Sequence, residues 1–270
     1  LLENSSSRIL EVIKRDDRLD KIAKDIAHHF PRRGFLGKGM VVSVDKYTAA
    51  KMYDKVKHYW GEEIKELTKE RNAAPTKEKR DELSHIIDYM KKVEMAVIIS
   101  EEADEEEKFK KQELDITQHR KKMQEITPEG EDIEDRFKNP HDNLQLVFVC
   151  AMWLTGFDIP SLATMYVYKP MSGHNLMQAI ARVNRVFQDK EGGLVVDYIG
   201  IAENLKEALK QYTESDKKTT GVDTELASQV LLEKHDLIKE LLHGHDYSKF
   251  FTGKSSERMQ AIVETMDYII

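Results

Sequence analysis

The run LQLVFVC at residues 144–150 is apolar without the spacing of an amphipathic helix, so it predicts a buried strand. Four similar runs occur along the chain, at residues 40–44, 95–100, 164–168 and 194–198. Charged stretches with helical spacing separate them. Short apolar strands that alternate with helices predict an α/β fold, with a mostly parallel sheet covered by helices on both faces.

A short polar loop follows the strand at 144–150. Its sequence is Thr155-Gly156-Phe157-Asp158, which combines a hydroxyl, a glycine and a carboxylate. Ligands of open α/β sheets bind at the carboxyl ends of strands, so this loop is a candidate site. A plain turn would have the same composition. The order of strand, loop, strand, arginine-bearing helix and strand is more specific than the tetrapeptide.

The arginine-bearing helix has two different faces. At about 100° per residue, Gln178, Arg182 and Arg185 fall within an arc of roughly 60°. An apolar cluster occupies the opposite side, with Leu176, Ile180, Val183 and Phe187. Two arginines one turn apart can hold polyanionic oxygens, because each guanidinium can bind a phosphate through two N–H groups. An ordinary surface helix with solvated arginines remains the alternative.

Residues 144–200 resemble motifs V and VI of the R (restriction, or motor) subunit of type I restriction-modification enzymes, which are superfamily 2 helicase-like translocases. MWLTGFDIPSL at 152–162 resembles motif V. LMQAIARVNRVF at 176–187, followed by GGLVVDYIG at 192–200, resembles motif VI and the strand after it. The resemblance extends from about residue 8 to about residue 210.

This resemblance implies a domain organisation. Residues 1–213 would form the second RecA-like helicase lobe, with residues 101–140 as an acidic, partly helical insertion. Residues 214–270 would be a linker and the start of a helical domain.

Helical spacing predicts helices at residues 8–30, from 45 to about 59, at 62–92 with an interruption near 73–76, and at 202–213.

The resemblance also implies site residues. Arg182 and Arg185 would act as arginine fingers on the γ-phosphate of ATP, with Gln178 assisting their placement. Gly156 and Asp158 would couple the nucleotide state to lobe movement. DNA-backbone contacts would come from Thr155, Gly156, Ser43, Lys46 and Tyr47, the last three in the motif IV region. The histidines lack companion ligands at useful spacing, so no metal site is expected.

The implied activity belongs to a larger protein. The sequence contains no GxxxxGK[ST] phosphate loop, so ATP and Mg²⁺ would be held chiefly by a first lobe that this chain lacks. The chain would be part of the ATP-dependent DNA-translocating subunit of a type I restriction endonuclease, and inactive alone. Its partners would be double-stranded DNA, the first lobe and nuclease domain of the same subunit, and the modification and specificity subunits.

Composition sets limits on these expectations. The formal net charge is −7, and residues 101–140 hold fourteen acidic and eight basic side chains. The rest of the chain is close to neutral, so contacts to DNA must be local. No apolar stretch approaches the ~20 residues of a membrane span. The chain starts without Met or a signal peptide and its end is apolar, so we expect an excised fragment of a cytoplasmic prokaryotic protein.

Two alternatives belong to other classes. The chain could be the second lobe of another superfamily 2 motor, such as a repair helicase. It could also be a non-catalytic interaction module, in which the acidic segment and the helical tail dock onto partners. Ala181 before the first arginine and the sequence MWLTGFDIP favour the restriction family, and the presence of both arginines disfavours the module.

Overall fold

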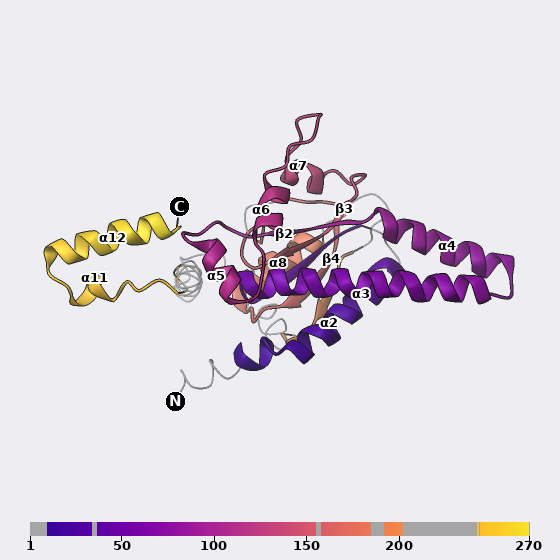
Figure 1. Cartoon of the computed structure of the whole chain (residues 1–270), viewed down its shortest axis with the longest axis horizontal. Coiled ribbons are helices and arrows are strands. Elements are labelled where there is room, and N and C mark those ends of the chain that lie inside the picture. Colours follow the sequence, from indigo (N-terminus) through magenta and orange to yellow (C-terminus); the bar gives the residue numbers. More distant parts are fainter. Residues whose placement is uncertain are drawn as a thin grey trace, which may run out of the picture.

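The computed structural model describes residues 10–33, 37–154, 158–184, 192–201, 242 and 244–269. Its centre is a five-stranded sheet with the strand order β2-β3-β1-β4-β5, in which every neighbouring pair is parallel (Figure 1). The predicted α/β class and the five strands are confirmed. The strands are β1 Lys38–Ser43, β2 Glu94–Ile98, β3 Leu144–Val149, β4 Leu162–Tyr168 and β5 Leu194–Asp197.

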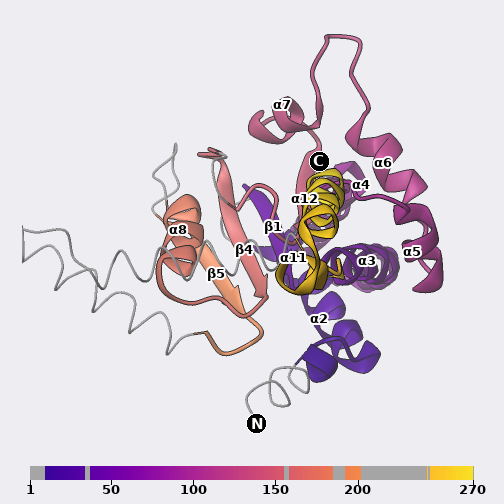
Figure 2. The ribbon, with the colours of Figure 1, turned by 90° about the vertical axis from the view of Figure 1, so that its left-hand side faces the viewer.

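Helices cover both faces of this sheet. Two helices, α2 and α3, lie on one side of the strands, and α8 lies on the other side (Figure 2). The helices are α2 Asp16–His29, the 3₁₀ turn η1 Phe30–Arg32, α3 Lys46–Ala73, α4 Lys77–Lys92, α5 Glu105–Lys111, α6 Thr117–Met123, α7 Ile133–Lys138, α8 Gly173–Val183, α11 Ser248–Thr252 and α12 Ser255–Ile269.

The strands are apolar throughout because both of their faces are buried. Successive side chains of a strand point to opposite faces. Val41 and Tyr166 therefore pack under α2 and α3, whereas Met40 and Met165 pack on the side of α8. All four are fully buried. Each such side chain stabilises the fold by about 1.5–3 kcal/mol relative to exposure.

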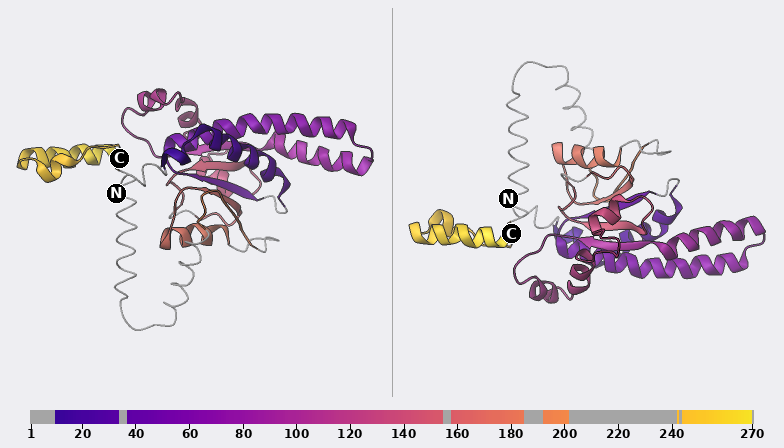
Figure 3. Two further views of the ribbon diagram at one scale, coloured as in Figure 1. Left: turned by 90° about the horizontal axis from the view of Figure 1, so that it is seen from below. Right: turned by 90° about the horizontal axis from the view of Figure 1, so that it is seen from above.

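Helix α3 is longer than the sequence pattern predicts. Asp45 begins it, because its side chain accepts a hydrogen bond of 2.7 Å from the Thr48 backbone N–H. We expected its end near residue 59, but the helix continues through Gly61 to Ala73. Beyond the sheet it pairs with α4, and the two form a hairpin that projects from the body of the domain (Figure 3). Leu67 on this extension is buried.

The predicted helix at residues 8–30 is broken. Residues 10–13 are helical, the chain leaves the helix at Lys14 and Arg15, and α2 starts at Asp16. Asp16 and Asp17 then lie in the first turn, where carboxylates stabilise the positive end of a helix. The interruption at residues 74–76, by contrast, falls where the sequence predicts it.

The acidic segment at 101–140 contains three short helices, α5, α6 and α7. Its α6 packs against the edge strand β2. From α6, Arg120 donates hydrogen bonds of 2.8 Å to the carbonyl oxygens of Ile99 and Ser100, and it forms an ion pair of 2.6 Å with Glu105. The segment thus covers the outer edge of the sheet, which would otherwise expose unpaired backbone groups.

The described part of the C-terminal region is helical. It comprises α11 and α12, which pack on each other. The predicted helix at 202–213 and the predicted linker lie outside the described residues. Among the helices that the structure does describe, none is long and apolar enough to cross a membrane.

Candidate functional site

Helix α8 carries the predicted arginine face. Leu176, Ala179 and Val183 are buried against the sheet, while Gln178 and Arg182 are partly exposed. The side of the helix that packs is therefore the one that the apolar spacing predicts. Arg185 and Phe187 lie outside the described residues, so their positions stay predictions.

Arg182 is bound to the loop that resembles motif V. Its Nε atom donates a hydrogen bond of 2.7 Å to the carbonyl oxygen of Leu154. Leu154 directly precedes Thr155 and Gly156, which lie outside the described residues. Asp158, on the far side of this gap, is exposed. The structure therefore joins two segments that the sequence singles out separately, although they are 28 residues apart.

The last turn of α8 lies toward the amino ends of the strands. The helix follows β4 and returns along the sheet to the start of β5, so its direction opposes that of the strands. The contact is close: a Cβ atom on Gly193, just before β5, would lie 2.1 Å from the Val183 carbonyl oxygen. Arg182 therefore does not lie at the carboxyl ends of the strands, where ligands of open α/β sheets usually bind.

Ser43, Lys46 and Tyr47 lie at the carboxyl end of β1, as the sequence predicts. Ser43 is fully buried, and its hydroxyl has no hydrogen-bond partner among the described residues. Lys46 Nζ lies 3.5 Å from a carboxylate oxygen of Glu102, and the Tyr47 hydroxyl donates a hydrogen bond of 3.3 Å to the same side chain. Burial, followed by the charge of Glu102, raises the pKa of Tyr47. Contact of these three residues with DNA stays a prediction.

The amino ends of the strands hold a polar cluster that the sequence analysis missed. At the start of β1, Lys38 is 1% exposed, and its ammonium group donates to three backbone carbonyl oxygens. The three distances are 3.4 Å to Arg136, 3.0 Å to Asp142 and 2.6 Å to Leu144. Burial lowers the pKa of Lys38 to about 8. No local pattern signals this arrangement, because the acceptors are about 100 residues away in the sequence.

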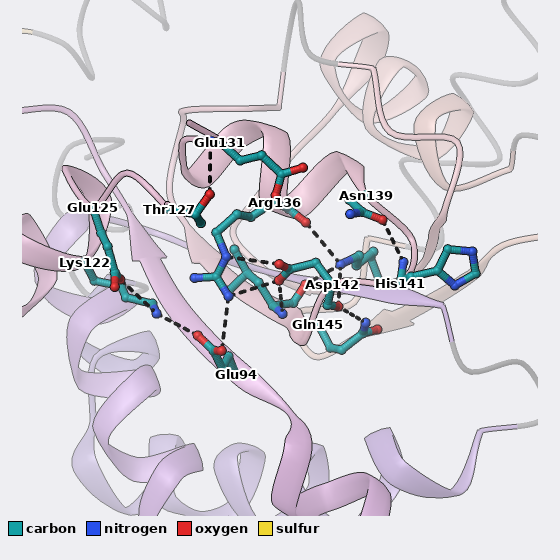
Figure 4. Close-up of polar contacts among 12 residues, drawn as sticks. Glu94, Lys122, Glu125, Thr127, Glu131, Arg136, Asn139, His141, Asp142 and Gln145 are labelled. Carbon is teal, nitrogen blue, oxygen red and sulfur yellow. Dashed lines mark hydrogen bonds and ion pairs between the residues drawn. The ribbon is translucent and has the colours of Figure 1, made fainter. Parts of the chain in front are cut away.

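Arg136 extends this cluster to the edge strand. Its guanidinium lies 3.1 Å from carboxylate oxygens of both Glu94 and Asp142, and Lys122 pairs with Glu94 at 2.6 Å (Figure 4). Burial alone would raise the pKa of Glu94, but hydrogen bonds from Lys122 and Arg136 hold it below its usual value. The cluster connects α6 and α7 to the first residues of β1, β2 and β3, and each charge in it has a partner, as a structural element requires.

Metal ligands do not gather in the part of the chain that the structure describes. No group of three or more His, Cys, Asp or Glu side chains in these ranges could hold a metal ion. The polar residues that the structure brings together are instead arginines, lysines and their carboxylate or carbonyl partners.

The fold and the arginine helix define the class of protein first: an α/β domain with a parallel, RecA-like sheet. Comparisons with known proteins then give the family. The family described as type I restriction enzyme subunit R domain 3 matches residues 38–200. A second family, the C-terminal region of subunits like the type I restriction enzyme HindI endonuclease subunit, matches residues 214–270. This chain belongs to the type I restriction enzyme R subunit family.

Similar proteins include two curated relatives and one solved structure. A Methanocaldococcus jannaschii protein described as a type I restriction enzyme MjaIXP endonuclease subunit is 33% identical over 95% of this chain and 21% of its own length. The HindI endonuclease subunit of Haemophilus influenzae is 59% identical over 33% of this chain and 9% of its own length. A solved fragment of an HsdR subunit from Vibrio vulnificus YJ016 has a TM-score of 0.42 and 17% identity, and covers 75% of this chain and 30% of that chain.

The comparisons with known proteins confirm the predicted family but leave the predicted site residues untested. The chain spans about a fifth of the length of the first of these relatives. The predicted resemblance to the R subunit is confirmed, and it is favoured over a repair helicase. The arginine fingers and the DNA contacts are not tested by these matches and remain predictions.

Proposed function

We propose that this chain is the second motor lobe of a type I restriction R subunit and supplies the arginine half of a shared ATP site. The observation that carries the proposal is the bond between Arg182 and Leu154. It holds one end of the arginine helix against the segment that resembles motif V. Family membership supports the same assignment.

The donor set of α8 suits a nucleotide phosphate. Arg182 is partly exposed in the last turn, and its permanently charged guanidinium can donate several N–H bonds to phosphate oxygens. Bound Mg²⁺–ATP would supply the transferable γ-phosphoryl group, held by the phosphate loop of a first lobe. Arg182 and Arg185 would donate to the oxygens on which charge develops, a contribution typically worth about 10³–10⁵ in rate. Gln178, one turn earlier, would hold the guanidiniums in place.

The same bond offers a route from nucleotide to DNA. Leu154 is the residue before Thr155 and Gly156, the proposed contacts to the DNA backbone. A displacement of α8 that follows a change in the nucleotide would therefore move this loop. Asp158 would transmit the same change to the far end of the loop. Lobe closure and opening of this kind can step a protein along duplex DNA.

The motif IV residues would take part in the DNA contact after a local rearrangement. Lys46 and Tyr47 both engage Glu102 in the present structure. A phosphate group that approached Lys46 would compete with that carboxylate. The proposed exchange needs only a few placed donors, since a translocase grips the backbone without reading bases.

The proposed assembly follows from the family. The lobe would act on double-stranded DNA beside the first lobe and the nuclease domain of its own subunit, in a complex with modification and specificity subunits. On this proposal residues 1–213 are the lobe, and residues 214–270 begin the helical region that follows it.

A separated-lobe experiment tests the proposal. The 270-residue chain alone should show no ATP turnover, because it lacks a phosphate loop. Addition of the preceding lobe from the same subunit should produce DNA-stimulated turnover. Robust hydrolysis by the purified chain alone would contradict the shared site, and so would turnover that the preceding lobe shows equally well without this chain.

A further inference from the structure

A cavity of about 570 Å³ lies beside the covered edge of the sheet, where α3, α4, β2 and α6 meet. Its buried lining is aromatic and apolar, with Tyr53 and Trp60 from α3, Met90 from α4 and Ala96 from β2. Cavities of this size and character bind small organic molecules in many proteins. The cavity lies on a different element from the arginine helix, so it is separate from the proposed ATP site.

A buried histidine lines this cavity. His119, from α6, is 3% exposed, and its ring meets the Tyr53 ring edge-on with 4.9 Å between centroids. Within the described ranges of the chain, no residue forms a hydrogen bond with its ring nitrogens. Burial lowers the pKa of His119 to about 4, so the ring is neutral near pH 7 and has one donor and one acceptor. The ring therefore brings a hydrogen-bond donor and an acceptor to the lining of the cavity, which makes it a candidate ligand contact.

The charged lining is mostly positive. It contains three lysines, Lys57, Lys91 and Lys122, and a single carboxylate, Glu94. Glu94 is already shared between Lys122 and Arg136. Lys91 forms no ion pair with any residue that the structure describes. Lys57 donates a hydrogen bond of 3.2 Å to the Tyr53 hydroxyl and interacts electrostatically with Asp54, which does not line the cavity. The side chains that line the cavity therefore carry a net positive charge.

We propose that this cavity binds a small organic anion with a planar apolar body. The planar body packs against Tyr53 and Trp60, the acidic group pairs with Lys57 and Lys91, and His119 supplies a directional hydrogen bond. An extended acidic peptide fits less well. A peptide would need the outer edge of β2, and α6 packs along that edge while Arg120 occupies the carbonyl groups just beyond the strand.

Anilinonaphthalene sulfonate, a planar aromatic anion with environment-sensitive fluorescence, is a suitable probe. The chain has two tryptophans, so Trp153→Phe leaves Trp60 as the sole tryptophan emitter. Titration of this variant should give saturable binding at one site, with emission of the dye sensitised by Trp60. Naphthoate should displace the dye, and polyglutamate should not.

Charge reversal at Lys91 provides the matched comparison. Lys91→Glu should weaken binding by about five-fold, the scale of a partly exposed ion pair. Lys111→Glu should leave it unchanged, because Lys111 also lies in the last turn of a helix but does not line the cavity. His119→Phe keeps an aromatic ring beside Tyr53 and should weaken binding by about five-fold through loss of one hydrogen bond.

Three results would overturn the inference. One is equal affinity in the parent chain and Lys91→Glu. Another is loss of binding in Phe251→Ser, because Phe251 is 66% exposed on α11 and a dye bound there would be on the tail. The third is displacement by polyglutamate but not by naphthoate, which would indicate a polypeptide site. Thermal unfolding of each variant verifies that it is folded; if His119→Phe is not, Lys91→Glu and naphthoate displacement decide the question.

Discussion

Arg182 and Leu154 are joined by a hydrogen bond of 2.7 Å between the guanidinium Nε and the backbone carbonyl oxygen. The acceptor is a main-chain atom, so substitution of the Leu154 side chain cannot remove it. The donor is on the last turn of a helix whose opposite face is buried. An arginine at this position can thus be replaced without exposing the apolar core, although the hydrogen bond to Leu154 is lost, so its chemical role can be tested in a folded variant.

The close approach of α8 to β5 predicts the effect of a small substitution. Gly193→Ala should lower the free energy of unfolding by about 1–3 kcal/mol, the usual cost of overpacking. The reason is the backbone of Val183, which lies within 2.4 Å of the position that a Cβ atom would occupy. Denaturant unfolding measures the change.

Gly61→Ala is the matched control for this prediction. A Cβ atom at Gly61 would meet nothing within 4 Å, and the residue is inside α3. This substitution should therefore stabilise the chain by about 0.5–1 kcal/mol. Equal effects of the two substitutions would mean that the contact between Gly193 and Val183 is not present.

Lys38 should be important for folding despite its charge. Lys38→Met removes the ammonium group that three carbonyl oxygens share and leaves buried acceptors without a donor. We expect the free energy of unfolding to fall by about 2–4 kcal/mol. Lys79→Met, at an exposed site whose lysine pairs with Glu82, should change it by no more than about 0.5 kcal/mol. If Lys38→Met leaves the free energy of unfolding unchanged, the carbonyl oxygens accept hydrogen bonds from water instead.

The carboxylate of Asp45 should make the free energy of unfolding sensitive to acid. Burial would raise its pKa, but Lys14, at 2.6 Å, and the Thr48 backbone N–H hold the pKa of Asp45 below its usual value. A lowered folded-state pKa means a stabilisation that is present above about pH 4 and is lost as the pH falls through the folded-state pKa. Asp45→Asn keeps a side-chain oxygen for the cap but removes the charge.

The measurement is the free energy of unfolding against pH. The difference between the parent and Asp45→Asn should be largest near neutral pH and should shrink below about pH 4. Asp81→Asn, at an exposed position of α4, is the matched control. A constant difference down to pH 2 would rule out the titration of Asp45 as its source.

The central sheet could be predicted from sequence because each strand is a short apolar run whose two faces are both buried. The packing face of α8 could be predicted for a similar reason, since Leu176 and Val183 recur at helical spacing. In both cases the signal is local. It depends only on the period of the side chains along one element.

The remaining features depend on partners that are distant in sequence. Helix α3 continues past Gly61 because α4 packs on its extension, and no pattern within residues 45–59 reports that packing. Lys38 is buried because carbonyl groups about 100 residues later converge on it. The Arg182–Leu154 bond likewise requires the loop after β3 to lie beside the end of α8, which only the folded chain shows.

The arginine role can be tested most directly by DNA-stimulated ATP hydrolysis of a complete R subunit that carries Arg182→Ala. We predict a fall in kcat of about 10³-fold or more in a variant that stays folded, with the thermal unfolding midpoint lowered only by the loss of the contacts of this side chain, such as the hydrogen bond to Leu154. Arg182→Lys should fail to restore the rate, since an ammonium group cannot replace a bidentate guanidinium. Arg71→Ala, in the last turn of α3, should keep full activity. Full ATPase in folded Arg182→Ala would contradict the arginine-finger assignment, and an unfolded variant would contradict the separation of chemical and structural roles.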